Sequence, residues 1–124
     1  MTINTDEEQA VSDVIHRYVE GYINADEALL RDAFAQDAAM NGYVGDRLVE
    51  GSAEPFIQRV LSEPPLASLG LELNYNIESV VVTGNAASVV LKEHGFGAFN
   101  FVDHMHVLKR DGAWKIISKT FVTF

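Results

Sequence analysis

Cysteine is absent from this chain, and its absence removes several kinds of chemistry at once. Without cysteine, the protein has no disulfides, no thiolate nucleophile and no cysteine-based zinc site. No apolar run approaches the roughly 20 residues that a membrane-spanning helix needs. The first residues, MTINTDEEQ, are acidic and lack the basic-then-apolar layout of a signal peptide. We therefore expect a cytoplasmic protein.

Positive charge is also scarce. Only 9 Lys and Arg residues stand against 18 Asp and Glu residues, so the formal net charge is −9. Such a surface repels nucleic acid and anionic membranes, and no patch rich in Lys or Arg offsets it. We expect the partner to be a small, uncharged molecule or a second copy of the chain. The length of 124 residues suits a single domain, residues 1–124.

Helical patterns come first along the chain. Apolar residues recur three and four positions apart from Val11 to Ile23, which predicts a long amphipathic helix that begins near Thr5. Asp26 is a favourable N-cap for a second, shorter helix. A third helix is expected from near Ser52 up to Pro64, because proline ends a helix.

The apolar period changes to two in the second half of the chain. Strands are expected over Leu71–Glu78, through Ala87–Leu91, from the HGFG bend to about Lys109, and over Trp114–Phe124, with short ones near 38–43 and 48–50. Helices followed by antiparallel strands predict an α+β fold. We expect a cone in which a strongly curved antiparallel or mixed sheet wraps around the long N-terminal helix and two shorter helices. A cone of this kind leaves a cavity for a ligand.

The segment FVDHMHVL, residues 101–108, contains the strongest candidate site residue. Side chains alternate along a strand, so Phe101, Asp103 and Met105 share one face, and His104 and His106 share the other. The first face is the more apolar and is expected to look toward the helices. Asp103 is then a carboxyl group on an apolar surface, where burial raises the pKa of an acid. Its alternative role is structural, as a cap or as the partner of an arginine or tyrosine.

Metal binding is not expected. The two histidines of the strand point the same way, and His94 could join them, but no carboxylate obviously shares that face. We expect these histidines at a subunit interface or in water. No metal and no cofactor are therefore assigned.

The segments YVEGYINADEALLRDAFAQDAAM (18–40) and FVDHMHVLKRDGAWKIISKTF (101–121) resemble the nuclear transport factor 2-like superfamily. Within it, the chain is most similar to the putative lumazine-binding and SnoaL-like groups. The resemblance covers nearly the whole chain, with a weaker match over 51–70. It implies a ketosteroid isomerase-like fold and a homodimer formed through the outer sheet face, the side of His104 and His106.

The resemblance to ketosteroid isomerases also implies roles for individual residues. Tyr18 and Asp103 match the tyrosine and the aspartic acid that hold a developing oxyanion in that family. The family's catalytic base has no counterpart, because its place is taken by Asn41-Gly42-Tyr43. Steroid isomerisation is therefore not expected.

Three functions remain open from the sequence. The first is binding of a small, mostly apolar molecule that is anchored by Tyr18 and Asp103. The second is a cofactor-free isomerase, dehydratase or cyclase in which Asp103 moves a proton and Tyr18 stabilises charge. The third is a dimeric association module without a ligand. The candidate ligand-binding residues are Tyr18, Tyr22, Tyr43, Phe56, Phe101, Asp103 and Met105.

Overall fold

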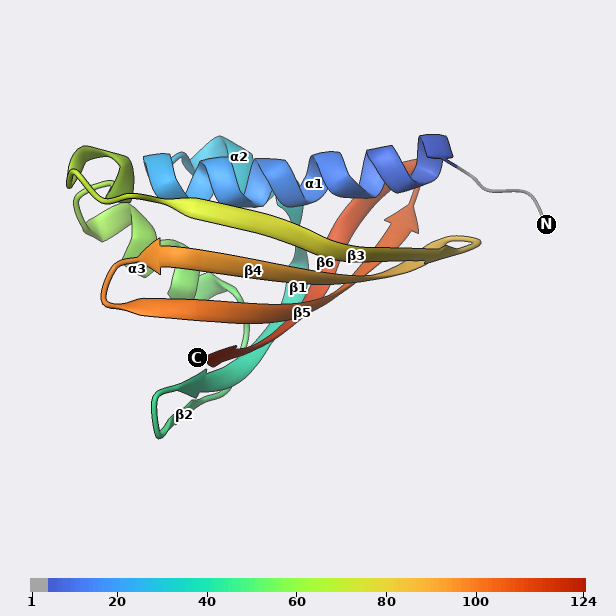
Figure 1. Ribbon diagram of the computed structural model, residues 1–124. Helices are drawn as coiled ribbons and strands as arrows, with labels where there is room; N and C mark the ends of the chain where they lie inside the picture. The colour runs from blue at the N-terminus through green and yellow to red at the C-terminus, as the bar shows by residue number, and fades with distance from the viewer. Residues whose placement is uncertain (1–4) are drawn as a thin grey trace.

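The computed structural model describes residues 5–124 (Figure 1). A long helix and a short one precede two strands, a third helix follows, and four long strands complete the chain. The elements are α1 (Thr5–Asn24), α2 (Glu27–Ala33), β1 (Phe34–Val44), β2 (Arg47–Val49), α3 (Glu54–Ser62), the 3₁₀ helix η1 (Leu66–Ser68), β3 (Asn74–Thr83), β4 (Ala86–Phe96), β5 (Phe99–Arg110) and β6 (Ala113–Thr123).

The six strands form one mixed sheet in the order β2-β1-β6-β5-β4-β3. The β1–β6 pair is parallel and the other pairs are antiparallel. Strands β1 and β6 cross the direction of β3, β4 and β5 obliquely, so the sheet is strongly twisted (Figure 1). Helix α1 lies along one face of this sheet, and α3 lies near one end of it. The predicted α+β architecture is confirmed.

The apolar stripe of α1 packs onto the sheet as its spacing predicts. Val11, Val14, Ile15 and Tyr18 are at most 1% exposed. They meet the inward-facing residues of the central strands, which alternate with exposed ones as expected for a sheet with one solvated face. The core therefore lies between α1 and the sheet.

Strand β3 begins later than its sequence pattern suggests. Leu71 was expected to face the core, but it is 38% exposed and precedes β3. The chain after α3 passes through η1 and then Gly70, which has a φ of +70°. Pairing with β4 starts only where Asn74 meets His94. The alternation of leucines was therefore a poor guide to the start of this strand.

A bulge in β6 changes which residues face the core. Val107 of β5 lies opposite Ile116, whereas His106 lies opposite Ser118, so Ile117 is the extra residue. After a bulge the alternation of side chains continues on the other parity. As a result Lys119 and Phe121 point inward together with Trp114 and Ile116. A strict alternation from Trp114 would place Lys119 outside.

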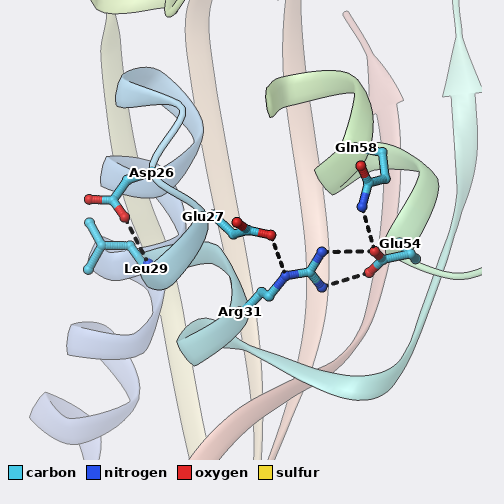
Figure 2. Close-up of polar contacts among 6 residues, drawn as sticks. All are labelled: Asp26, Glu27, Leu29, Arg31, Glu54 and Gln58. Carbon is cyan, nitrogen blue, oxygen red and sulfur yellow. Dashed lines mark hydrogen bonds and ion pairs between the residues drawn. The ribbon is translucent and has the colours of Figure 1, made fainter. Parts of the chain in front are cut away.

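Helix α3 is tied to α2 by a clamp of charged groups (Figure 2). The Arg31 guanidinium donates to both carboxylate oxygens of Glu54, each at 2.9 Å, and its Nε donates to Glu27 at 2.9 Å. Gln58 also donates to Glu54. Hydrogen bonds from Arg31 and Gln58 lower the pKa of Glu54 to about 2, so the clamp stays charged in mildly acidic solution. This contact fixes the position of α3 near one end of the sheet, which we call the open end. The opposite end, under the first turns of α1, is called the closed end (Figure 1).

Candidate ligand-binding cavity

A cavity of about 390 Å³ lies between α3 and the inner face of the sheet at its open end. Its walls are mostly apolar, as in most small-molecule sites. Six aromatic residues contribute to them: Tyr22, Phe56, Phe96, Phe99, Phe101 and Phe121. Edge-to-face contacts hold several of these rings in place, including Tyr22 against Phe56, with ring centroids 5.1 Å apart, and against Phe96, at 5.4 Å. We call these six residues the aromatic chamber.

Lys119 supplies the positive charge at the floor of the cavity. This lysine lines the cavity but is only 5% exposed. Its Nζ donates to the Tyr18 hydroxyl at 2.6 Å and lies 3.7 Å from Oδ2 of Asp103. The Nζ also lies over the rings of Tyr18 and Phe56, 4.9 and 4.8 Å from their centroids, in the arrangement of a cation–π contact.

Two carboxyl groups lie behind Lys119. Glu93 of β4 and Asp103 of β5 are both 0% exposed. If both groups are ionised, none of their four oxygens has a hydrogen-bond partner among residues 5–124. Burial first, then the charge of Asp103 and hydrogen bonding to it, raise the pKa of Glu93 well above 4.5, while the charge of Lys119 lowers it. A proton on Glu93 gives the pair the donor that it otherwise lacks.

The cavity floor therefore has a defined charge balance. A protonated Glu93 leaves one negative charge, on Asp103, to compensate the ammonium of Lys119. Tyr18 completes the group, because burial raises the pKa of its hydroxyl well above 10.0 and keeps it neutral. We call Tyr18, Glu93, Asp103 and Lys119 the polar belt.

The sequence-based candidates fall into three groups. Tyr22, Phe56 and Phe101 line the cavity. Tyr18, Asp103 and Met105 are buried behind the lining, at 0%, 0% and 1% exposure. Tyr18 and Asp103 therefore reach a ligand only through Lys119, because both contact its Nζ.

Tyr43 lies apart from the other candidates. It is 46% exposed and does not line the cavity, whereas Met40 and Val44 of the same strand do. Successive residues of a strand face opposite sides, so Tyr43 belongs to the outer face. This corrects its expected place as a ligand contact.

Two residues of the polar belt were not among the sequence-based candidates. Glu93 continues the inward series of Ala87, Val89 and Leu91 by one more step, so the alternation of β4 carried a usable signal. Lys119 gave no such signal, because the bulge at Ile117 reverses the alternation just before it.

Asn41 and Gly42, which take the place of the ketosteroid isomerase base, make structural contacts. The Asn41 side-chain oxygen accepts a hydrogen bond from the Gly51 N–H at 3.1 Å. Gly42 packs against β6 so closely that a Cβ atom on it would lie 2.0 Å from the Phe121 carbonyl oxygen. These residues join β1 to its neighbours.

The outer face of the sheet bears the two histidines of β5. His104 and His106 are exposed, while Asp103, Met105 and Val107 between and beside them are buried. The face assignment made from alternation is therefore confirmed. Within residues 5–124 no three histidine or acidic side chains converge in a way that could hold a metal ion. No helix in the same range is long and apolar enough to cross a membrane.

Comparison with known proteins places this architecture in a family. The model of the family described as "Putative lumazine-binding" matches residues 6–122. The chain belongs to this family. No curated protein matches it.

Solved structures share the fold over nearly the full length. An NTF2-like protein of unknown function from Shewanella baltica is 26% identical, with a TM-score of 0.83 and coverage of 100% of this chain and 98% of that chain. A second NTF2-like protein, from Methylobacillus flagellatus, is 23% identical, with a TM-score of 0.88 and coverage of 99% and 96%. A ketosteroid isomerase-like protein from Erwinia carotovora atroseptica is 16% identical, with a TM-score of 0.71 and coverage of 98% of each chain. The fold is thus NTF2-like.

Proposed function

We propose that the protein binds a small, mostly apolar molecule in the aromatic chamber, with an acceptor oxygen of the ligand on Lys119. The observation that supports this is a mostly apolar cavity of about 390 Å³ with the buried ammonium of Lys119 at its floor. An ammonium has three N–H donors. Tyr18 accepts one, and Asp103 balances the charge at 3.7 Å, so Lys119 can still donate to a ligand. Tyr18 and Asp103 orient the anchor.

The family description points in the same direction, since lumazines are flat molecules with carbonyl oxygens. A flat ring system suits walls made of edge-to-face aromatic side chains. The chemistry of the cavity does not require one particular ring system, so the proposal concerns a class of ligand.

A fluorescent probe tests the proposal directly. N-phenyl-1-naphthylamine is neutral, apolar and fluorescent in dry surroundings. We expect it to bind one site per chain with a micromolar Kd. Val49→Trp adds a large ring to the cavity lining and should weaken this binding at least tenfold. Leu48→Trp is the matched control, because Leu48 is the preceding residue, is 50% exposed and does not line the cavity.

The outcomes are distinct. If the probe binds equally well to both variants, it does not occupy the cavity. If it does not bind to the unmodified protein, the proposal of an apolar ligand site is wrong. Thermal melting of both variants shows whether each is folded.

A second candidate function is proton transfer without a cofactor, as in an isomerase, dehydratase or cyclase. The Glu93–Asp103 pair favours it, because acid/base catalysis by carboxyls commonly uses two titratable groups with separated pKa values. In this reading a proton passes between the ligand and Asp103 by way of the Lys119 Nζ, which lies 3.7 Å from Oδ2, because Asp103 itself is 0% exposed. Exchange of the α-hydrogens of 2-tetralone in D₂O, followed by NMR, should then be accelerated by the protein and not by Asp103→Asn. Equal exchange rates with both proteins would exclude this activity for that ketone.

We also propose that the chain forms a homodimer through the outer sheet face. Tyr43, Leu48 and Val122 are exposed apolar residues, and they lie side by side across three strands. The row continues to Val102, which pairs with Val122 and lies beside His104. An exposed apolar row of this kind is a common feature of subunit interfaces.

A further inference from the structure

The basic residues of this acidic protein differ in whether they have a carboxylate partner. Seven of the 9 form ion pairs: Arg17, Arg31, Lys92, Lys109, Arg110, Lys115 and Lys119. Arg47 and Arg59 have none within 4.0 Å among residues 5–124. Both of them line the cavity. In a chain of formal charge −9, guanidinium groups without a partner are therefore gathered at one place.

The two arginines lie at the mouth of the cavity. Both are exposed, in contrast to the buried Lys119 at the floor. Arg47 comes from β2 and Arg59 from α3, so they belong to two different walls. The guanidinium carbon of Arg59 lies 5.7 Å from the centroid of the Phe56 ring, a stacking contact that holds the group against the aromatic chamber. Its charge also lowers the pKa of Tyr22, against the larger effect of burial.

The floor and the mouth differ in what they can bind. Lys119 is compensated by Asp103, so the floor suits a neutral acceptor such as a carbonyl oxygen. Arg47 and Arg59 have no ion-pair partner among residues 5–124, and a planar guanidinium is well suited to a carboxylate, sulfonate or phosphate group. We infer that the ligand is an aromatic or apolar acid whose ring system fills the aromatic chamber and whose anionic group lies between Arg47 and Arg59. This rests on the proposed function and narrows it to anionic ligands.

Two acidic residues oppose this arrangement and set its strength. Glu50 and Glu63 also line the cavity, and neither has an ion pair among residues 5–124. They repel an anion at the mouth, so the attraction to the arginines is partly cancelled at low ionic strength. The overall negative charge led us to expect an uncharged ligand, and the two arginines argue for the opposite.

A matched pair of probes separates charge from shape. 8-Anilino-1-naphthalenesulfonate is N-phenyl-1-naphthylamine with one added sulfonate group. At low salt we expect the sulfonate to bind about tenfold more tightly than the neutral probe, and we expect the ratio to fall as salt is added. Val49→Trp must weaken binding of both probes, which shows that both occupy the cavity.

Charge variants then locate the anion. Arg59→Gln and Arg47→Gln should each weaken binding of the sulfonate roughly threefold to tenfold and change binding of the neutral probe less than twofold. Glu63→Gln should strengthen binding of the sulfonate. Lys92→Gln removes the same charge outside the cavity lining and should leave both affinities unchanged.

Each outcome decides the matter. If the neutral probe binds as tightly as the sulfonate, or if the arginine variants weaken both probes alike, the anionic ligand class is wrong while the cavity proposal stands. If neither probe binds, both proposals fail together.

Discussion

The two ends of the sheet's inner face are built from different side chains. At the closed end, under the first turns of α1, the buried residues are mainly aliphatic, such as Val11, Ile15, Val89 and Val107. At the open end, beside α3, they are the six rings of the aromatic chamber. Two aromatic residues also lie at the closed end: Phe34, which pairs with Ile116, and Trp114, whose indole N–H donates to Glu7 at 2.8 Å.

The change occurs on four elements, but its position is staggered from one strand to the next: Asp103 pairs with Leu91 and Phe121, whereas Glu93 pairs with Phe101 and Lys119 with Met105. Along α1 it runs from Ile15 through Tyr18 to Tyr22; along β4 from Leu91 through Glu93 to Phe96; along β5 from Met105 through Asp103 to Phe101; and along β6 from Ile116 through Lys119 to Phe121. The residue in the middle belongs to the polar belt in every case. The aliphatic residues on one side of the belt are buried in the core, whereas the rings on the other side line the cavity. The polar belt thus separates a filled core from a cavity.

The comparison between the closed and open ends predicts its largest effect on the free energy of unfolding. Leu91→Ala removes a side chain that is 0% exposed at the closed end, and it should lower the free energy of unfolding by about 2–5 kcal/mol. Phe101→Ala removes a half-buried ring beside an existing cavity, and it should cost about 1–2 kcal/mol. Denaturant unfolding of both variants measures the difference.

The same two variants should affect probe binding in the opposite order to stability. Phe101→Ala is expected to weaken binding of N-phenyl-1-naphthylamine, and Leu91→Ala should leave it nearly unchanged. Equal losses of stability at the two positions would mean that the open end is packed as tightly as the closed end.

A smaller effect tests the boundary between the two ends. The pKa of Glu93 is raised in the folded protein, so the folded state binds a proton that the unfolded state has lost above about pH 4.5. The protein should therefore lose stability as pH rises from about 4.5 toward the raised pKa, by about 1.4 kcal/mol per pH unit. Glu93→Gln mimics the protonated acid and should remove this loss, so the variant should be the more stable protein at pH 8.

Unfolding measured from pH 4 to pH 8 checks this sign. The two proteins should have similar stability at the acidic end and diverge as pH rises. Parallel pH profiles would mean that Glu93 is ionised in the folded protein. Asp103→Asn is a useful companion, because Glu93 can then ionise and take over as the partner of Lys119; we expect that variant to fold.

The sequence predicted the fold and one half of the polar belt. Alternation and helical spacing were enough for α1 and β5, because both run without interruption, and they placed Tyr18 and Asp103 on the inner face. The other half depended on events that a periodic pattern cannot contain. The bulge at Ile117 turns Lys119 inward, and only the pairing of β6 with β5 creates that bulge. Arg47 and Arg59 are distant in sequence and become neighbours of one cavity only through the positions of β2 and α3.

The smallest effect on stability is expected on the opposite face of β5. His104 and His106 are exposed, so replacing both with alanine should change the free energy of unfolding by no more than about 0.5 kcal/mol. Binding of N-phenyl-1-naphthylamine should also be unchanged, because Asp103 and Met105 keep their places on the inner face. If the outer face forms the homodimer, the same double variant should dissociate at a higher protein concentration in sedimentation equilibrium. A dimer that dissociates as before would place the interface away from these two histidines, whereas weaker probe binding would show that the two faces of the strand are coupled.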